Sequence, residues 1–148
     1  EDGDVLWDDK PVRSNRPAFY GSLVWMQHRV GFKADLTLVE NLRFEAALRP
    51  QGSDSLEKVL ERLEISRLKP LPLRSLSAGQ QRRVALARML LADVPLWLMD
   101  EPFTNLDREG RALVMQLVKE HLDKGGMCVM AAHQDVEIDA PVKKVILQ

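Results

Sequence analysis

The sequence predicts an α/β domain in which helices cover a parallel sheet. Short apolar runs alternate along the chain with segments of helical periodicity, which is the pattern of such folds. The runs at residues 23–26, 94–99 and 127–132 are continuously apolar, which is typical of strands covered on both faces. The 148 residues, 45% hydrophobic and 29% charged, are long and apolar enough to form one core.

Composition excludes several other classes of protein. No apolar run approaches the ~20 residues that cross a bilayer. The formal net charge of −1 provides no overall positive field, so we expect no nucleic-acid partner. The single cysteine, Cys128, cannot form an internal disulfide, which fits a reducing compartment. The acidic N-terminus does not resemble a signal peptide, and it does not begin with methionine.

The first elements are a short strand, a loop and a buried strand. Residues 5–7 are apolar between acidic turn residues and predict the short strand. Residues 8–18 contain two prolines and several polar side chains, which predicts a loop. Residues 23–26 predict the buried strand.

Two helices should follow. Thr37 can cap a helix over residues 39–48, which residues 50–52 would end. Asp54 and Glu57 have the spacing of a capping box for a second helix. Its apolar side chains would share one face: Leu56, Val59, Leu60 and Leu63.

The second half of the chain continues the alternation. A helix should begin after Ser77, and a strand should follow at residues 94–99. Residues 110–124 form an amphipathic helix pattern that two glycines end. The runs at residues 127–132 and 145–147 predict two further buried strands.

Two adjacent carboxylates provide the strongest chemical signal. Asp100 and Glu101 directly follow a buried strand, and ligands of open α/β sheets bind beyond the carboxyl ends of the strands. One carboxylate suits Mg²⁺, and the other suits a water that attacks a phosphate. A bland alternative is a strand that ends in solvated acids.

The second chemical signal is the N-terminus of a predicted helix. Ser77 and Gln80 have capping-box spacing, and the free N–H groups of a helix start attract anions such as phosphate. Gly79 permits close approach of a backbone, and Arg82 and Arg83 add positive charge. Without a ligand, the same residues describe an ordinary capped helix with a solvated basic face.

A histidine follows the next apolar run. His133 would lie at the same sheet edge as Asp100 and Glu101, where imidazole can bond a phosphate or orient a water. A lone histidine is more often structural, so this signal depends on the other two.

Taken together, these motifs resemble the nucleotide-binding domain of ABC transporters. The resemblance covers nearly the whole chain. The matching segments are residues 36–42 (after the Q-loop), 76–80 (the signature, with Ala78 where glycine is commoner), 96–101 (Walker B and the catalytic glutamate), 105–107 (the D-loop) and His133 (the switch histidine).

The resemblance implies a P-loop NTPase-like fold that lacks the N-terminal Walker A part. Residues 38–90 would form a helical signature subdomain, and the remainder the ATPase core. ATP and Mg²⁺ would be the ligands, with Asp100 holding the metal and Glu101 and His133 catalytic. The nucleotide-contacting residues of a second copy would be Ser77, Ala78, Gly79, Gln80 and Asp107.

The resemblance also implies partners and a location. Residues 31–37, residues 100–107 and His121 before two glycines are similar to the ATP-binding subunits of heme exporters of cytochrome c maturation. Such a subunit forms a homodimer and binds an integral membrane permease at the cytoplasmic face of the bacterial inner membrane. Two alternatives stay open: a cassette ATPase for another cargo, and a non-catalytic half that offers only its signature helix.

Two departures from the family pattern limit what this chain does alone. The 148 residues contain no Gly-x-x-x-x-Gly-Lys-Ser/Thr loop. Losing its charge-assisted hydrogen bonds removes on the order of 5–10 kcal/mol, whereas a micromolar site provides only about 8 kcal/mol. We therefore expect very weak ATP binding, no hydrolysis and low stability for the isolated chain. At the Q-loop the matching position is Arg29, with Gln27 two residues earlier.

Overall fold

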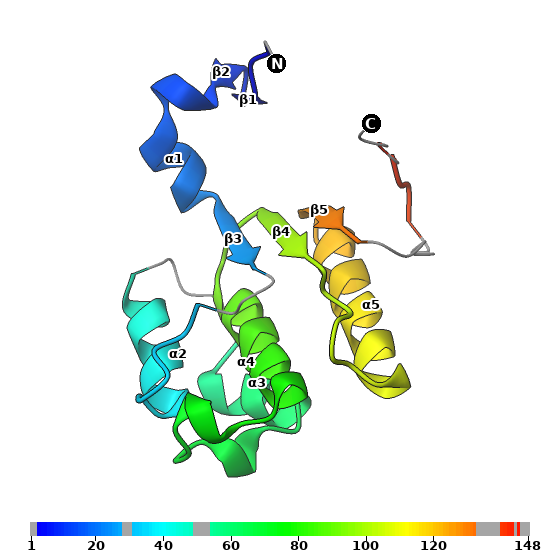
Figure 1. Cartoon of the computed structure of the whole chain (residues 1–148). Helices are drawn as coiled ribbons and strands as arrows, with labels where there is room; N and C mark the ends of the chain where they lie inside the picture. The colour runs from blue at the N-terminus through cyan, green and yellow to red at the C-terminus, as the bar shows by residue number, and fades with distance from the viewer. Residues whose placement is uncertain (1–2, 28–30, 49–53, 133–139, 144, 146–148) are drawn as a thin grey trace.

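A parallel three-stranded sheet forms the centre of the molecule, as the sequence predicts. The computed structural model describes residues 3–27, 31–48, 54–132, 140–143 and 145. The sheet has the order β3-β4-β5, and both pairings are parallel (Figure 1). The strand bounds are Leu23–Met26 (β3), Leu96–Asp100 (β4) and Met127–Ala131 (β5). Of the predicted strand at residues 145–147, only Val145 is described, and it is exposed and not in a strand.

The register brings the carboxyl ends of the three strands to one edge. Met26 is paired with Met99, and Asp100 is paired with Ala131. The chain therefore leaves β3 at Gln27 beside the end of β4, where Asp100 and Glu101 lie. We call this the carboxyl edge of the sheet.

Helices surround the sheet unequally. Three of them gather on one side of β3 and β4, and another packs against β5 (Figure 1). Their bounds are Leu38–Ala47 (α2), Leu56–Arg62 (α3), Ala78–Leu91 (α4) and Arg108–Asp123 (α5). α4 is the central helix, because it packs against α2, α3 and β3. Its buried side chains include Val84, Leu86 and Met89.

The N-terminal segment contains more structure than predicted. β1 (Leu6–Trp7) confirms the short strand, but it forms an antiparallel hairpin with β2 (Lys10–Pro11). A 3₁₀ turn and the helix α1 (Arg16–Gly21) follow, so the predicted loop over residues 8–18 is largely wrong. Pro17 lies in the first turn of α1, where its missing N–H costs no helical hydrogen bond.

The cap of α2 agrees with the sequence, and the cap of α3 is shifted by one residue. Thr37 and Glu40 form a complete capping box at the start of α2. At α3 the cap is Ser55, whose hydroxyl accepts from the Lys58 N–H at 3.3 Å, so the predicted capping box at Asp54 is wrong. Serine and aspartate are both good caps, and the extended backbone of Ser55 decides between them.

β5 is less buried than its apolar run predicts. Met127 and Val129 are 47% and 60% exposed, while Cys128 and Met130 on the other face pack against the core. α5 covers that face, and within the described ranges nothing covers the opposite one. The prediction that all the strands are covered on both faces is therefore wrong for β5. Trp25, on β3, is also 48% exposed.

None of the helices in the described part of the chain combines the length and apolar character that crossing a bilayer requires.

Candidate functional site

The start of α4 is built as predicted. Ser77 caps the helix: its hydroxyl accepts from the Gln80 N–H at 3.2 Å, and its own N–H donates to Gln80 Oε1 at 2.9 Å. This reciprocal pair satisfies two N–H groups at the start of the helix. Ser77 and Ala78 are exposed to solvent, so the helix start is accessible, as an anion-binding terminus requires.

Gly79 allows the start of α4 to approach a neighbouring loop. A Cβ atom at Gly79 would lie 3.0 Å from the backbone oxygen of Asn105. Asn105 itself has a left-handed φ of +61°. The loop after β4 thus packs directly on the predicted signature segment, and a larger residue at position 79 would push the two apart.

Beside this contact lies a cavity of about 350 Å³. Its lining includes Ala78 and Arg82 of α4 together with Gly31, Thr104 and Asn105. The cavity places open space next to the helix start.

Asp100 and Glu101 lie where the sequence places them, at the carboxyl edge. Asp100 is the last residue of β4, and Glu101 turns the chain with a left-handed φ of +49°. A left-handed non-glycine residue costs ~1–3 kcal/mol, so the surrounding structure must hold it. The Glu101 N–H donates to the Ala131 carbonyl at 2.9 Å, and the Glu101 carbonyl accepts from the Thr104 N–H at 3.2 Å.

These two carboxylates fit a magnesium ion that is shared with a phosphate. Mg²⁺ takes one or two carboxylates, substrate phosphates and water. Both side chains are partly exposed. Within the residues that the structure describes, no group of three or more histidine, cysteine or acidic side chains could hold a metal unaided. The donor set therefore suits a metal that arrives with its phosphate ligand.

Asp107 lies at the start of α5. Its carboxylate accepts from the Gly110 N–H at 2.8 Å and caps the helix. The residue is exposed, so a partner could still contact it.

Two predicted residues fall outside the described part of the chain. These are His133 and Arg29. Ala131 and Ala132, which precede His133, are described, and the pairing of Ala131 with Asp100 brings the end of β5 to the carboxyl edge. Gln27 directly follows β3 and is exposed at the same edge.

The bland alternative for the helix after Ser77, a solvated basic face, is wrong for Arg82. Arg82 is only 3% exposed. Burial lowers the pKa of its guanidinium, while the negative charges of Asp100 and Glu101 act in the opposite direction. The spacing of residues along the helix indicates this burial. Arg82 shares a helix face with Ala85, Leu86 and Met89, which are all buried.

A second cluster, also missed, lies at the other end of β4. The His121 ring stacks on Trp97 with ring centroids 4.1 Å apart and planes 8° from parallel. Its Nε2 lies 3.2 Å from the Pro95 carbonyl oxygen. Gly126 closes the cluster, because a Cβ there would lie 2.3 Å from His121 Nε2. Burial lowers the pKa of His121.

Comparison with known proteins identifies the family of the chain. Residues 1–104 match the model of the ABC transporter family. The chain therefore belongs to the ABC transporter family.

Individual members of the family are similar to this chain over most of its length. The chain is 41% identical over 139 residues to the cytochrome c biogenesis ATP-binding export protein CcmA of Methylococcus capsulatus, covering 93% of this chain and 67% of that protein. It is 38% identical over 143 residues to the protein of the same name from Vibrio cholerae, covering 95% and 69%. The chain thus spans about two thirds of the length of these relatives.

Solved structures confirm the fold. The dimeric, post-hydrolysis structure of the ATP-binding cassette MJ0796 bound to ADP and Pi superimposes with a TM-score of 0.76 at 25% identity, covering 90% of this chain and 63% of that one. An ABC transporter ATP-binding protein of Pyrococcus furiosus gives a TM-score of 0.74 at 21% identity, covering 93% and 68%. The predicted fold class, an ABC nucleotide-binding domain with a parallel sheet and flanking helices, is confirmed.

Proposed function

We propose that this chain is part of the ATP-hydrolysing subunit of an ABC exporter. The observation that carries the proposal is the turn at Glu101. Its left-handed backbone is bonded to Ala131 and Thr104, and it presents two adjacent carboxylates at the carboxyl edge. That edge is where open α/β sheets bind their ligands.

In the proposed reaction, Glu101 acts as the general base. It takes a proton from a water whose oxygen attacks the γ-phosphorus of ATP, and the bond from that phosphorus to the bridging oxygen breaks to release ADP. Mg²⁺, when bound through Asp100, would supply positive charge against the triphosphate. His133 would donate a hydrogen bond to the γ-phosphate, a role that rests on its motif alone.

A second copy of the chain would complete the site. The exposed start of α4, with Ser77, Ala78 and Gly79, would meet the γ-phosphate of ATP held by the other copy. Gln80 supports it through the capping box, and Asp107 would meet the partner near the start of α5. This assigns residues 38–90, with α2, α3 and α4, to a helical subdomain that presents the signature segment.

The motif count assigns the Q-loop position to Arg29, and we propose that Gln27 serves there instead through a shifted loop. Gln27 follows β3 directly, and its backbone carbonyl accepts from Arg82 beside Asp100. Its side chain carries the oxygen that a cation or a water needs, whereas arginine has no acceptor.

The names of the relatives support a proposal for the cargo and the location. Both named relatives are cytochrome c biogenesis ATP-binding export proteins. We extend this to heme export for cytochrome c maturation, with a membrane permease as partner and the cytoplasmic face of the inner membrane as location. Export of another cargo is the alternative, and co-purification of a heme-handling membrane protein would separate the two.

The test uses the longest natural polypeptide that contains these residues. We expect it to hydrolyse ATP, and we expect Glu101→Gln to lower kcat by about 10²–10⁴-fold while ATP binding persists, because glutamine cannot accept the proton. ATP should then accumulate in dimers of the variant, which sedimentation with labelled ATP detects. Unchanged hydrolysis in the Glu101→Gln variant would contradict the assignment.

The 148-residue chain alone provides the matched comparison. Titration with Mg²⁺-ATP should show no micromolar binding, since no phosphate-binding loop lies within these residues. Micromolar binding would contradict the proposed dependence on such a loop. If the longest natural polypeptide also lacks binding but closes on ATP held by another subunit, the function is that of a non-catalytic half.

A further inference from the structure

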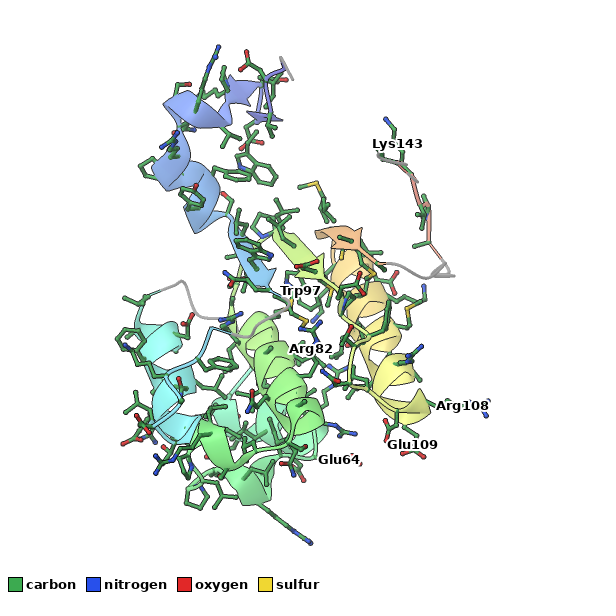
Figure 2. The ribbon with its side chains drawn as sticks, viewed as in Figure 1. Glu64, Arg82, Trp97, Arg108, Glu109 and Lys143 are labelled. Carbon is green, nitrogen blue, oxygen red and sulfur yellow. The ribbon has the colours of Figure 1, made fainter. Side chains whose placement is uncertain are left out.

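Arg82 is a charged residue in the core of the molecule. It lies in the second turn of α4, two residues beyond Gln80, and is 3% exposed. Figure 2 shows it between α4 and the segment that connects β4 with α5. Its side chain therefore crosses from the helix with the signature segment to the strand with the two carboxylates.

Within the part of the chain that the structure describes, its guanidinium makes four hydrogen bonds, and each goes to a backbone carbonyl. Nη1 donates to Gln27 at 2.9 Å. Nη2 donates to Asp100 at 3.0 Å and also to Glu101. Nε lies 3.4 Å from the carbonyl oxygen of Pro102. One guanidinium thus binds three consecutive carbonyls of the turn after β4 together with the residue that follows β3.

The middle carbonyl of the three belongs to the left-handed residue. Glu101 has a φ of +49°, and its carbonyl accepts from Arg82 as well as from the Thr104 N–H. The backbone conformation of Glu101 determines where its carboxylate lies. A residue that binds the carbonyls on both sides of Glu101 and its own carbonyl restrains that conformation directly.

We propose that Arg82 is the positioning residue that holds Asp100 and Glu101 at the carboxyl edge and ties them to α4. What the two carboxylates do rests on the proposed function. The restraint itself does not, because it is a property of the backbone.

Lysine cannot reproduce this arrangement. A guanidinium presents five N–H donors in a planar fork, whereas an ammonium group presents three donors from one point. Arg82→Lys therefore retains the charge but loses the simultaneous contacts with two chain segments. Arg83→Lys is the matched control, since Arg83 lies on the same helix and bonds instead to the Leu63 carbonyl and the Glu64 carboxylate.

Hydrogen exchange of backbone amides in the longest natural polypeptide gives a readout that needs no ATP. In Arg82→Lys we expect the amides of Glu101 and Thr104 to exchange at least about tenfold faster, with the interior of α4 within about twofold of wild type. Arg83→Lys should leave both amides unchanged. Equal acceleration along the whole chain, or none at Glu101 and Thr104, would overturn the proposal.

Kinetics add a second, separable readout. Arg82→Lys should lower kcat at least about tenfold with KM for ATP within about threefold, because misplaced carboxylates affect the transition state more than ATP binding. A rise in KM alone would overturn the positioning role. If the wild type hydrolyses no ATP, the proposed function fails, while hydrogen exchange still decides the role of Arg82.

A neutral variant tests the proposal if Arg82→Lys fails to fold. Arg82→Gln keeps two donors and buries no unpaired charge. It should show the same local acceleration of exchange at Glu101 and Thr104. Unfolding of both Arg82 variants while Arg83→Lys folds would overturn the proposal in favour of a general structural role.

Discussion

The two ends of β4 are stabilised by different physics. At the carboxyl edge, Glu101 adopts a left-handed backbone and a buried arginine binds carbonyl oxygens. At the other end, the His121 ring stacks on Trp97 and lies close to Gly126. One end depends on directional hydrogen bonds around a strained turn, and the other on close packing.

The carboxyl edge of β4 presents side chains to solvent, whereas the Trp97 end fixes the strand against α5. Strained backbone and buried charge cost free energy, and they are common at functional sites. Stacked rings over a glycine contribute packing and hold α5 on the sheet, because His121 belongs to that helix. We therefore expect substitutions at the Trp97 end to change stability, and those at the carboxyl edge to change chemistry.

Gly126→Ala should give the largest loss of stability. The new Cβ would lie 2.3 Å from His121 Nε2, so the ring must leave its stack on Trp97. Overpacking of this kind costs about 1–3 kcal/mol, which thermal or urea unfolding would measure. Gly21→Ala is the control, since nothing lies within 4 Å of a Cβ there.

A double variant sharpens this prediction. In a His121→Ala background the clash is absent, so adding Gly126→Ala should cost less than about 0.5 kcal/mol. Equal costs in both backgrounds would mean that the ring does not lie over Gly126.

Ser77 should separate the cap of α4 from its nucleotide contact. Ser77→Ala removes the acceptor for the Gln80 N–H and should destabilise the chain by about 1 kcal/mol. Ser77→Asp keeps a cap, so unfolding should stay within about 0.5 kcal/mol of wild type. Its negative charge should nevertheless oppose ATP-dependent dimerisation. Normal dimerisation of the aspartate variant would contradict a phosphate contact at Ser77.

His121 should produce the smallest effect, a dependence of stability on pH. Burial lowers its pKa from the ordinary 6.5, so the unfolded chain binds the proton more tightly than the folded chain. Its contribution is fully present above pH 6.5 and decreases as the pH falls through 6.5 toward the lowered pKa. Unfolding between about pH 8 and 5.5 should show this decrease in wild type and not in His121→Gln. The same slope in both would assign it to another group.

Local signals in the sequence predicted most of the elements. The cap at Thr37, the capping box at Ser77 and the glycine after α5 each depend on neighbouring residues alone, and the structure contains all three. The apolar run at residues 127–132 predicted the strand, but its burial depends on what packs against it. Val129 is exposed for that reason.

The sequence also predicted only part of the candidate site. The placement of Asp100 and Glu101 followed from a strand ending in two acids. The burial of Arg82 did not, because its partners are carbonyls that carry no side-chain signature. Only its helical spacing with Leu86 and Met89 indicated the buried face.

The most direct measurement is a crystal structure of the Glu101→Gln variant of the longest natural polypeptide with Mg²⁺-ATP. The γ-phosphate should lie at the carboxyl edge beside Asp100, with Ser77 of a second copy within hydrogen-bonding distance. A triphosphate bound at the Trp97 end of β4, or bound without any contact from a second copy, would contradict the central claim.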